Sequence, residues 1–379
     1  MDFTLSKEQE MCQQLYRDFA VNEAEPLAQE IDEEERFPEE TIRLAADYGF
    51  MGIPIAKEFG GQGCDSLTYI MCVEELSKVC ATTGVIVASH TSLACDPIKN
   101  FGTPEQKEKY LVPLAKGEKI GAFGLTEPNA GTDSAGQQTK AVLDGDHYIL
   151  NGSKIFITNG GVADIYIVFA MTDKSLGNKG ISAFIVEKGM PGFTFAKKEK
   201  KMGIRGSATC ELIFEDVKIP KENLLGKING GFKIAMTTLD GGRIGIAAQA
   251  LGIAQGAIDE TVKYTKERRQ FGKAISDFQN TRFQLADMQA RVDAARLLVY
   301  RAAKAKDSGQ RFSLEAAMAK LFASETAMNV TTRCVQLFGG YGYMREYPIE
   351  RMMRDAKITE IYEGTSEVQR MVIAGAMLK

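Results

Sequence analysis

Residues 355–370 read Asp355-Ala356-Lys357-Ile358-Thr359-Glu360-Ile361-Tyr362-Glu363-Gly364-Thr365-Ser366-Glu367-Val368-Gln369-Arg370. An apolar-lined segment is followed by a break at Gly364 and then by the start of a helix. Ser366 and Gln369 have the spacing of a capping box, which predicts a helix from Glu367 to about Leu378.

This pattern places Glu363 beside the first free N–H groups of a helix, between an aromatic residue and a glycine. Apolar neighbours raise the pKa of a carboxyl group and N–H dipoles lower it, so the pKa of Glu363 is tunable. Taken alone, a glutamate before a helix cap is more often a surface residue that favours the helix start. The rest of the sequence has to decide between these two interpretations.

The composition is that of a globular protein. The chain has 379 residues, of which 44% are hydrophobic and 25% are charged, so it can bury a large core and form more than one domain. The net charge of −4 argues against a nucleic-acid partner, which favours a basic surface. With only two histidines, His90 and His147, a zinc site or a histidine-based triad is not expected, and we predict no metal.

The cysteines and the chain start indicate a cytoplasmic protein. The N-terminal residues lack the pattern of a targeting leader, and no apolar run reaches the roughly 20 residues that span a bilayer, so no membrane partner is expected. An odd, dispersed set of cysteines without a C-x-x-C pair suits a reducing compartment. The cysteines are Cys12, Cys64, Cys72, Cys80, Cys95, Cys210 and Cys334.

Periodicity divides the chain into three parts, and the predicted fold class is α+β and multidomain. Residues 1–118 predict a helical domain, residues 119–228 a central antiparallel β domain of barrel or sandwich type, and residues 229–379 a helical bundle. Helices are predicted at 5–31, 39–48, 66–80, 83–101, 232–268, 281–308 and 313–338. Strands are predicted at 141–143, 147–150, 154–158, 165–171, 181–186 and 209–214, with a hairpin turn at 144–146.

Two segments of the β domain have the residues to hold a ligand. Residues 123–133 leave a strand and form a loop rich in small and hydroxyl residues, which can approach a phosphate or a heteroaromatic edge; a plain Pro/Gly turn has the same pattern. Residues 154–160 place Phe156 and Thr158 on one face of a strand. An aromatic ring and a hydroxyl suit a flavin, and a structural cross-strand pair is equally compatible with the spacing.

Two further segments end long helices. Arg268 lies at the C-terminal end of one helix, where its charge suits either the helix dipole or a bound diphosphate, and Gln279 follows shortly after. Residues 336–343 end another helix in glycines, which indicates either a C-cap or backbone exposed for close approach to a nucleotide.

In this order and spacing, the segments resemble the signatures of the acyl-CoA dehydrogenase family, and within it those of the short-chain (butyryl-CoA) branch. The resemblance covers essentially the whole chain. The matching segments are 126–133, 154–160, 268–272, 336–340 and 361–370.

The resemblance implies an FAD-dependent enzyme that converts butyryl-CoA to crotonyl-CoA, or the reverse. Glu363 is then the general base that takes the α-proton, and flavin N5 takes the β-hydride. FAD is expected between the β domain and the C-terminal bundle, with the neighbouring subunit of a homotetramer completing the site. The implied redox partner is an electron-transferring flavoprotein. An oxidase that uses oxygen and a non-catalytic flavoprotein on the same fold remain alternatives, and the preferred acyl length and the direction stay open.

The resemblance also implies the binding residues. Residues expected at the flavin ring and its ribityl side are Phe123, Leu125, Thr126, Gly131, Thr132, Phe156, Ile157 and Thr158, with Thr365, Ser366 and Glu367 closing over the flavin. Residues expected from the adjacent subunit at the diphosphate and adenosine are Arg268, Gln270, Phe271, Gln279, Gln336, Leu337, Phe338, Gly339 and Gly340. Residues expected at the acyl-CoA are Thr132, Asp240, Gly241, Gly242, Arg243 and Gly364.

Three positions depart from the usual family pattern or distinguish its branches. Thr132 stands where many members have Ser, and Phe156 stands where many have Trp, which keeps the aromatic plane but loses an N–H donor. Branched-chain members that take their base from the long helix carry Glu near position 242, where this chain has Gly242. The resemblance therefore favours Glu363 as the base.

Overall fold

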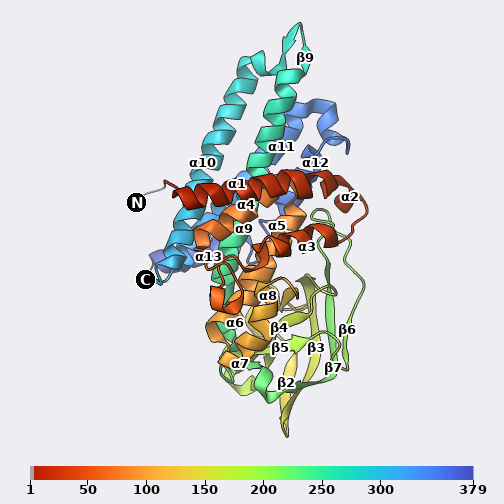
Figure 1. Ribbon diagram of the computed structural model, residues 1–379, viewed down its shortest axis with the longest axis vertical. Helices are drawn as coiled ribbons and strands as arrows, with labels where there is room; N and C mark the ends of the chain where they lie inside the picture. The colour runs from red at the N-terminus through yellow and green to blue at the C-terminus, as the bar shows by residue number, and fades with distance from the viewer. Residues whose placement is uncertain (1–3, 379) are drawn as a thin grey trace.

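Helix α9 (Gly231–Glu267) runs through the middle of the molecule in a computed structural model that describes residues 4–378 (Figure 1). Its N-terminal end packs against the β sheet, and its middle packs against α4 (Ser66–Val79) and α11 (Ser313–Phe338). Residues 241–254 are all buried. A helix that is surrounded on every side belongs to the core, so α9 links the three parts of the chain.

The N-terminal helices follow the predicted pattern, with two interruptions. Thr103 caps α7 and Pro104 is its first residue, a favoured position for proline. The helices predicted at 5–31 and 83–101 each contain a π-helical turn that ends two residues before a proline, Pro26 or Pro97. Proline has no N–H and its ring clashes with the preceding turn, which explains the change in helical bonding. The helices are α1 (Lys7–Phe19), α2 (Ala28–Glu33), α3 (Glu39–Asp47), α4, α5 (Ala81–Ser89), α6 (Asp96–Phe101), α7 (Pro104–Gln106) and α8 (Val112–Ala115).

Residues 121–225 form one eight-stranded sheet in the order β6-β7-β3-β2-β4-β5-β8, with β1 beside β4. The predicted hairpin is confirmed, because β2 and β3 pair antiparallel from Lys140↔Asn151 to Asp144↔His147. The strands predicted at 147–150 and 154–158 are a single strand, and its pairing with β7 shifts register twice. The strands are β1 (Gly121–Gly124), β2 (Lys140–Asp144), β3 (His147–Thr158), β4 (Ile165–Met171), β5 (Ile181–Glu187), β6 (Phe193–Phe195), β7 (Thr209–Pro220) and β8 (Leu224–Leu225).

The sheet is not wholly antiparallel, which corrects the sequence prediction. Strands β1 and β2 both run parallel to β4 and occupy the same edge of it, β1 at residues 165–168 and β2 at residue 171. The loop 125–139 joins β1 to β2. It therefore leaves the sheet between two strands that pair, one after the other, with the same side of β4. Strand β4 is buried on both faces, which is the usual environment of parallel pairing.

A buried ion pair fixes this loop to the sheet. The Lys154 ammonium donates to Glu127 Oε1 at 2.7 Å, to the Leu125 carbonyl at 3.1 Å and to Gln137 Oε1 at 3.0 Å. The Glu127 carboxylate also accepts the N–H groups of Gln138 at 2.5 Å and Thr139 at 3.0 Å. Burial lowers the pKa of Lys154 to about 8, although Glu127 favours its charged form. Both ends of the loop thus depend on one pair of buried charges.

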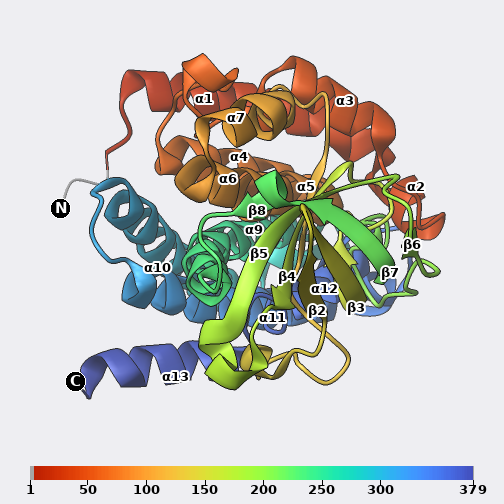
Figure 2. The ribbon, with the colours of Figure 1, turned by 90° about the horizontal axis from the view of Figure 1, so that it is seen from below.

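Helices α10 (Gln279–Asp307), α11 and α12 (Ile349–Ile358) pack against α9, and α13 (Ser366–Met377) packs against α11 (Figure 2). The three long helices predicted at 232–268, 281–308 and 313–338 are confirmed to within two residues. A short hairpin, β9 (Arg269–Gln270) with β10 (Lys273–Ala274), closes the tip between α9 and α10, at the opposite end of the molecule from the sheet (Figure 1). Within residues 4–378, no helix combines the length and the apolar composition that crossing a membrane requires.

We predict that Lys154→Met lowers the free energy of unfolding by about 3–5 kcal/mol, because it leaves the Glu127 charge buried without its partner. Urea denaturation monitored by circular dichroism measures this change. Lys140→Met is the matched control, since Lys140 is exposed in the adjacent strand β2, and its effect should stay within about 0.5 kcal/mol. Equal stability of the two variants would contradict the role of the ion pair.

Candidate active site

Glu363 lies in a tight turn between α12 and α13. Its backbone φ is +53° and that of Gly364 is +95°, so two consecutive residues adopt the left-handed region. The glycine takes this conformation freely, whereas the glutamate is held in it by the surrounding contacts. Thr365 then becomes extended and caps α13 by accepting the N–H of Val368.

This cap corrects the sequence prediction, which assigned the capping role to Ser366. Ser366 is instead the first residue of α13, and its buried hydroxyl has no hydrogen-bond partner within residues 4–378. The left-handed turn moves the start of the helix by one residue, an effect that the capping-box spacing did not reveal. Gln369, the predicted partner of Ser366 in the capping box, instead donates its side-chain amide to Gly364 O.

Three side chains hold the turn through its backbone carbonyl groups. The Lys320 ammonium donates to Gly364 O at 2.7 Å, and the Gln369 amide donates to the same oxygen at 2.8 Å and to Glu363 O at 3.4 Å. Arg243 Nε donates to Glu363 O at 3.5 Å. The turn is therefore fixed from α9, α11 and α13, while the Glu363 carboxylate takes no part in holding it.

The Glu363 carboxylate lies against the bare backbone of α9. A Cβ atom added at Gly242 would lie 2.1 Å from Glu363 Oε2 and 2.8 Å from Leu93 Cδ2, so any side chain at position 242 would displace the carboxylate. Glu363 is half-buried as a residue, but its Oε2 is shielded from solvent and has no hydrogen-bond partner among the described residues. A shielded, unpartnered carboxylate oxygen is able to accept a proton from a bound molecule.

Burial raises the pKa of Glu363 to about 7, and the positive charges of Lys320 and Arg243 limit the increase. The sequence predicted that apolar surroundings would raise this pKa, as they do, and that N–H dipoles would lower it. The groups that lower the pKa of Glu363 are instead the two cations, because the turn directs the side chain toward Gly242 of α9. A carboxyl group with a pKa near neutrality is suited to general base catalysis.

The structure brings together most of the predicted acyl-CoA residues. Gly242, Arg243 and Gly364 surround Glu363, and Arg243 Nη1 pairs with Asp240 Oδ1 at 2.7 Å. The Ser313 hydroxyl donates to the other oxygen of Asp240. Gly241 is next to the Lys306–Asp96 ion pair, where an added Cβ would lie 3.3 Å from the Lys306 ammonium. Thr132 is exposed and lies in the loop 125–139 of the β domain.

The predicted flavin-ring residues of the β domain lie on β1, on the loop 125–139 and on β3. The side chains of Phe123, Leu125 and Ile157 are buried in the core, so these residues can present only their backbone to a ligand. Phe156 has a 62% exposed ring at a bulge of β3, with a φ of +58°, and Thr158 is half-buried. The Ile155 N–H donates to the Thr126 carbonyl at 2.9 Å, which joins the loop that contains Gly131 to the strand that carries Phe156. Thr365, Ser366 and Glu367 form the start of α13.

The predicted diphosphate and adenosine residues form a separate surface at the tip near β9. Arg268 lies over the Tyr341 ring at 5.3 Å, and a Cβ at Gly339 or Gly340 would have nothing within 4 Å, so this backbone is open to a ligand. Phe271 is 93% exposed and Gln279 is exposed. The residues that line a groove here include Arg268, Gln270, Gln336, Leu337, Phe338, Gly339, Gly340 and Tyr341. In one chain this surface lies at the end opposite the β domain (Figure 1).

Sequence reasoning missed Lys320 and Gln369 as residues that hold the Glu363–Gly364 turn, and the Lys154–Glu127 pair that holds the loop. Lys320 has a sequence signal, because it is a charged residue within an alanine-rich stripe of α11 that includes Ala316, Ala319 and Ala323. A lysine on a buried face requires a polar partner. Its partner is 44 residues away in the sequence, at Gly364, so no local pattern identifies it.

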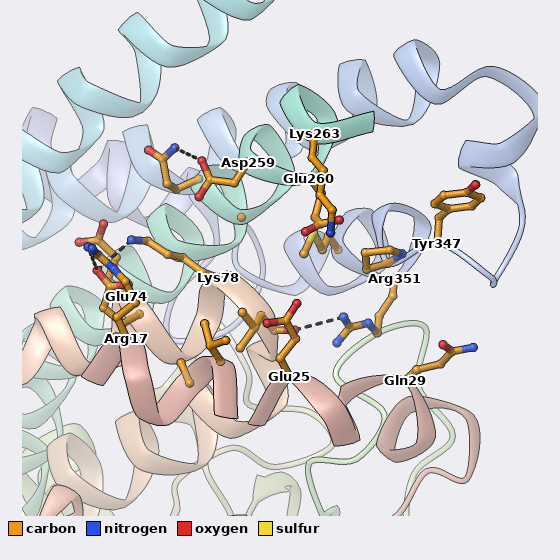
Figure 3. A pocket seen from close by; sticks show the side chains of 18 of the residues that line it. Arg17, Glu25, Gln29, Glu74, Lys78, Asp259, Glu260, Lys263, Tyr347 and Arg351 are labelled. Atoms are coloured by element: carbon orange, nitrogen blue, oxygen red, sulfur yellow. Dashed lines mark hydrogen bonds and ion pairs between the residues drawn. The ribbon is translucent and has the colours of Figure 1, made fainter. Parts of the chain in front are cut away.

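A second cavity, of about 750 Å³, lies between α1, α4, α9 and α12 (Figure 3). Its walls are strongly charged, and part of this charge is paired, Arg17 with Glu75 at 3.3 Å and Arg296 with Glu74 at 3.2 Å. Lys78 also pairs with Glu75 at 2.8 Å. We therefore interpret this part of the cavity wall as a structural ion-pair network, which is separate from the site around Glu363.

The chain matches family models over nearly its whole length. The acyl-CoA dehydrogenase N-terminal domain matches residues 6–118, the middle domain residues 122–217 and the C-terminal domain residues 229–378. These matches cover every segment on which the sequence resemblance rested.

Individual proteins are similar over the full length of both chains. The short-chain specific acyl-CoA dehydrogenase of Clostridium acetobutylicum is 63% identical over 379 residues, with 100% of each chain covered. The structure of butyryl-CoA dehydrogenase from Megasphaera elsdenii matches with a TM-score of 0.99 at 56% identity, covering 100% of both chains. A chain from structural work on the electron transferring flavoprotein of Acidaminococcus fermentans and flavin-based electron bifurcation matches with a TM-score of 0.99 at 58% identity, again covering 100% of both. The resemblance inferred from the sequence is thus confirmed, and the chain belongs to the FAD-dependent acyl-CoA dehydrogenase family.

Proposed function

We propose that this protein catalyses the α,β-dehydrogenation of short-chain acyl-CoA, converting butyryl-CoA to crotonyl-CoA or the reverse, with Glu363 as the general base. The observation that carries the proposal is the Glu363 carboxylate, whose Oε2 is shielded and unpartnered among the described residues. The full-length similarity to short-chain specific and butyryl-CoA dehydrogenases supports the substrate class.

The chemistry needs a positioned carboxylate because the α-C–H of a thioester is a weak acid. Glu363 accepts this proton on Oε2, and its raised pKa makes it a stronger base than an exposed carboxylate. Arg243, Lys320 and Gln369 hold the turn by its carbonyl groups, so the base keeps its direction while its charge changes. An acyl chain that enters beside Gly242 would exclude water from the carboxylate and raise its basicity further.

Bound FAD would supply the acceptor for the β-hydrogen, which would leave the substrate as hydride. The residues present fit this cofactor in two places. Phe156 offers an exposed ring beside the loop 125–139, which suits a flavin, and Arg268 lies beside the open backbone of Gly339 and Gly340, which suits a diphosphate and a nucleotide.

The separation of these two surfaces supports a site shared between subunits. In one chain the hairpin β9–β10, which follows Arg268, lies at the end of the molecule away from the sheet that carries Phe156 (Figure 1). We propose that a second copy contributes Arg268 and residues 336–340, within a homotetramer. The redox partner we propose is an electron-transferring flavoprotein, which the similarity to the chain from the Acidaminococcus fermentans work supports.

We predict that Glu363→Gln retains FAD and binds butyryl-CoA but reduces the flavin roughly a thousandfold more slowly, because a general base has been removed. Anaerobic bleaching of the flavin absorbance measures this rate. Glu360→Gln is the matched control, since Glu360 lies in the same segment and pairs with Lys357 at 2.6 Å. A near-normal rate in Glu363→Gln would end the assignment of the base.

The two alternative functions have their own tests in the wild-type protein. Peroxide formed from acyl-CoA and oxygen alone would favour an oxidase, and a flavin that does not bleach would favour a non-catalytic flavoprotein.

We predict that kcat/KM for butyryl-CoA rises with pH through a midpoint near 7, the pKa to which burial raises Glu363. The base acts only when deprotonated, so activity is lost as the pH falls below this value. Initial rates from pH 5 to pH 9 measure the profile. A midpoint near that of an exposed glutamate, or a flat profile, would contradict the environment described for Glu363.

We predict that Arg268→Ala weakens FAD binding about tenfold or more, because a charge-assisted hydrogen bond contributes roughly 1.5–3 kcal/mol. The flavin content after dialysis measures the loss. Arg269→Ala removes the same charge from the next, also exposed, residue and should retain the flavin. Unchanged flavin content in Arg268→Ala would refute its role.

A further inference from the structure

Lys320 is a fully buried lysine that contacts the catalytic turn. Its side chain is 0% exposed and emerges from α11 among buried alanines, with the ammonium 2.7 Å from Gly364 O. Burial lowers the pKa of Lys320 to about 8, and Glu363 is the group that most favours its charged form. Burying an ammonium group is costly, so the charge is expected to have a function at this position.

Hydrogen bonding alone does not account for a charged residue at this position. Gly364 O already accepts the neutral amide of Gln369 at 2.8 Å. A second neutral donor of similar length would complete the pair of bonds that a carbonyl oxygen accepts, without the cost of burying a charge. What Lys320 adds beyond Gln369 is a positive charge next to the turn that carries Glu363.

Among the described groups around Glu363, Lys320 is the cation for which no carboxylate lies within ion-pair distance. Arg243 of α9 is the second cation, but its guanidinium is paired with Asp240 at 2.7 Å. Tyr69 of α4 and Tyr362 are electrically neutral near pH 7, and burial raises their pKa values further above this pH. Leu93, between α5 and α6, is apolar. The remaining carboxylates that act on Lys320 are Glu360 and Glu367, on either side of the turn.

We propose that Lys320 is a positioning residue for the reaction: it fixes the Glu363–Gly364 turn through Gly364 O, and its charge favours the ionised form of the Glu363 carboxylate. The inference rests on the proposed function, since it assigns to Lys320 an effect on the proposed base. Lys320 touches neither the reacting atoms nor the cofactor in this role, and acts through Glu363. Its removal must therefore change the pH dependence of the reaction as well as its rate.

The test compares two kinds of variant as FAD-loaded holoenzymes. Lys320→Met removes both the donor and the charge, and Lys320→Gln removes the charge but keeps an amide that can donate to Gly364 O. Gln369→Met is the matched control, because it removes the neutral donor to the same oxygen and leaves the charge. If Lys320→Met does not retain FAD, Lys320→Gln carries the test.

We predict that the pH profile of kcat/KM for butyryl-CoA has a higher midpoint in both Lys320 variants. Raising the midpoint by one pH unit lowers the rate about tenfold on the acid side, so the wild-type to variant ratio should be at least about threefold larger at pH 6 than at pH 9. Gln369→Met should lower the rate by the same factor at every pH. A midpoint in the Lys320 variants equal to that of the wild type would overturn the proposal.

A second readout does not depend on turnover. The infrared band of the protonated Glu363 carboxyl group, assigned by its loss in Glu363→Gln, should titrate at a higher pH in Lys320→Gln than in the wild type. An unchanged titration midpoint would overturn the charge effect of Lys320 while the proposed function stands. A Glu363→Gln variant with normal turnover would instead overturn the proposed function, so the two failures are distinguishable.

Discussion

The contact between the Glu363 carboxylate and the bare backbone of α9 at Gly242 is the constraint on which the rest of the site depends. It requires glycine at one position of a core helix, since an added Cβ would lie 2.1 Å from Oε2. It also requires a left-handed turn to direct the side chain toward α9. Burying a carboxylate is costly, and two cations from α9 and α11 moderate that cost without forming a direct ion pair with the carboxylate oxygens.

The β domain also has to hold an irregular segment in a defined place, namely the loop 125–139. Strands β1 and β2 share one edge of β4 in succession, and the loop between them leaves the sheet there. The buried Lys154–Glu127 pair then ties both ends of this loop to β3. In both regions a buried lysine donates to backbone carbonyl oxygen at a site where the chain leaves regular structure, so buried charge is used to fix irregular backbone.

Much of this architecture could be predicted from the sequence, because helix periodicity, caps and the hairpin turn are local signals. The long helices and the β2–β3 hairpin are confirmed close to their predicted bounds. The cap at Thr365, the continuity of β3 and the parallel pairing of β4 were not predicted, because each depends on contacts between distant segments. The same holds for Lys320, whose partner Gly364 lies on another helix–turn element. The motif residues were found by family resemblance, which identifies residue types but not the charges that tune Glu363.

The most direct test of the central claim is anaerobic flavin reduction by butyryl-CoA carrying deuterium at the α-carbon, compared with unlabelled substrate. If Glu363 takes the α-proton in the step that reduces the flavin, deuterium slows the wild-type enzyme, and Glu363→Gln loses the reduction with either substrate. Equal rates with both substrates in the wild type, together with rapid reduction in Glu363→Gln, would contradict the account.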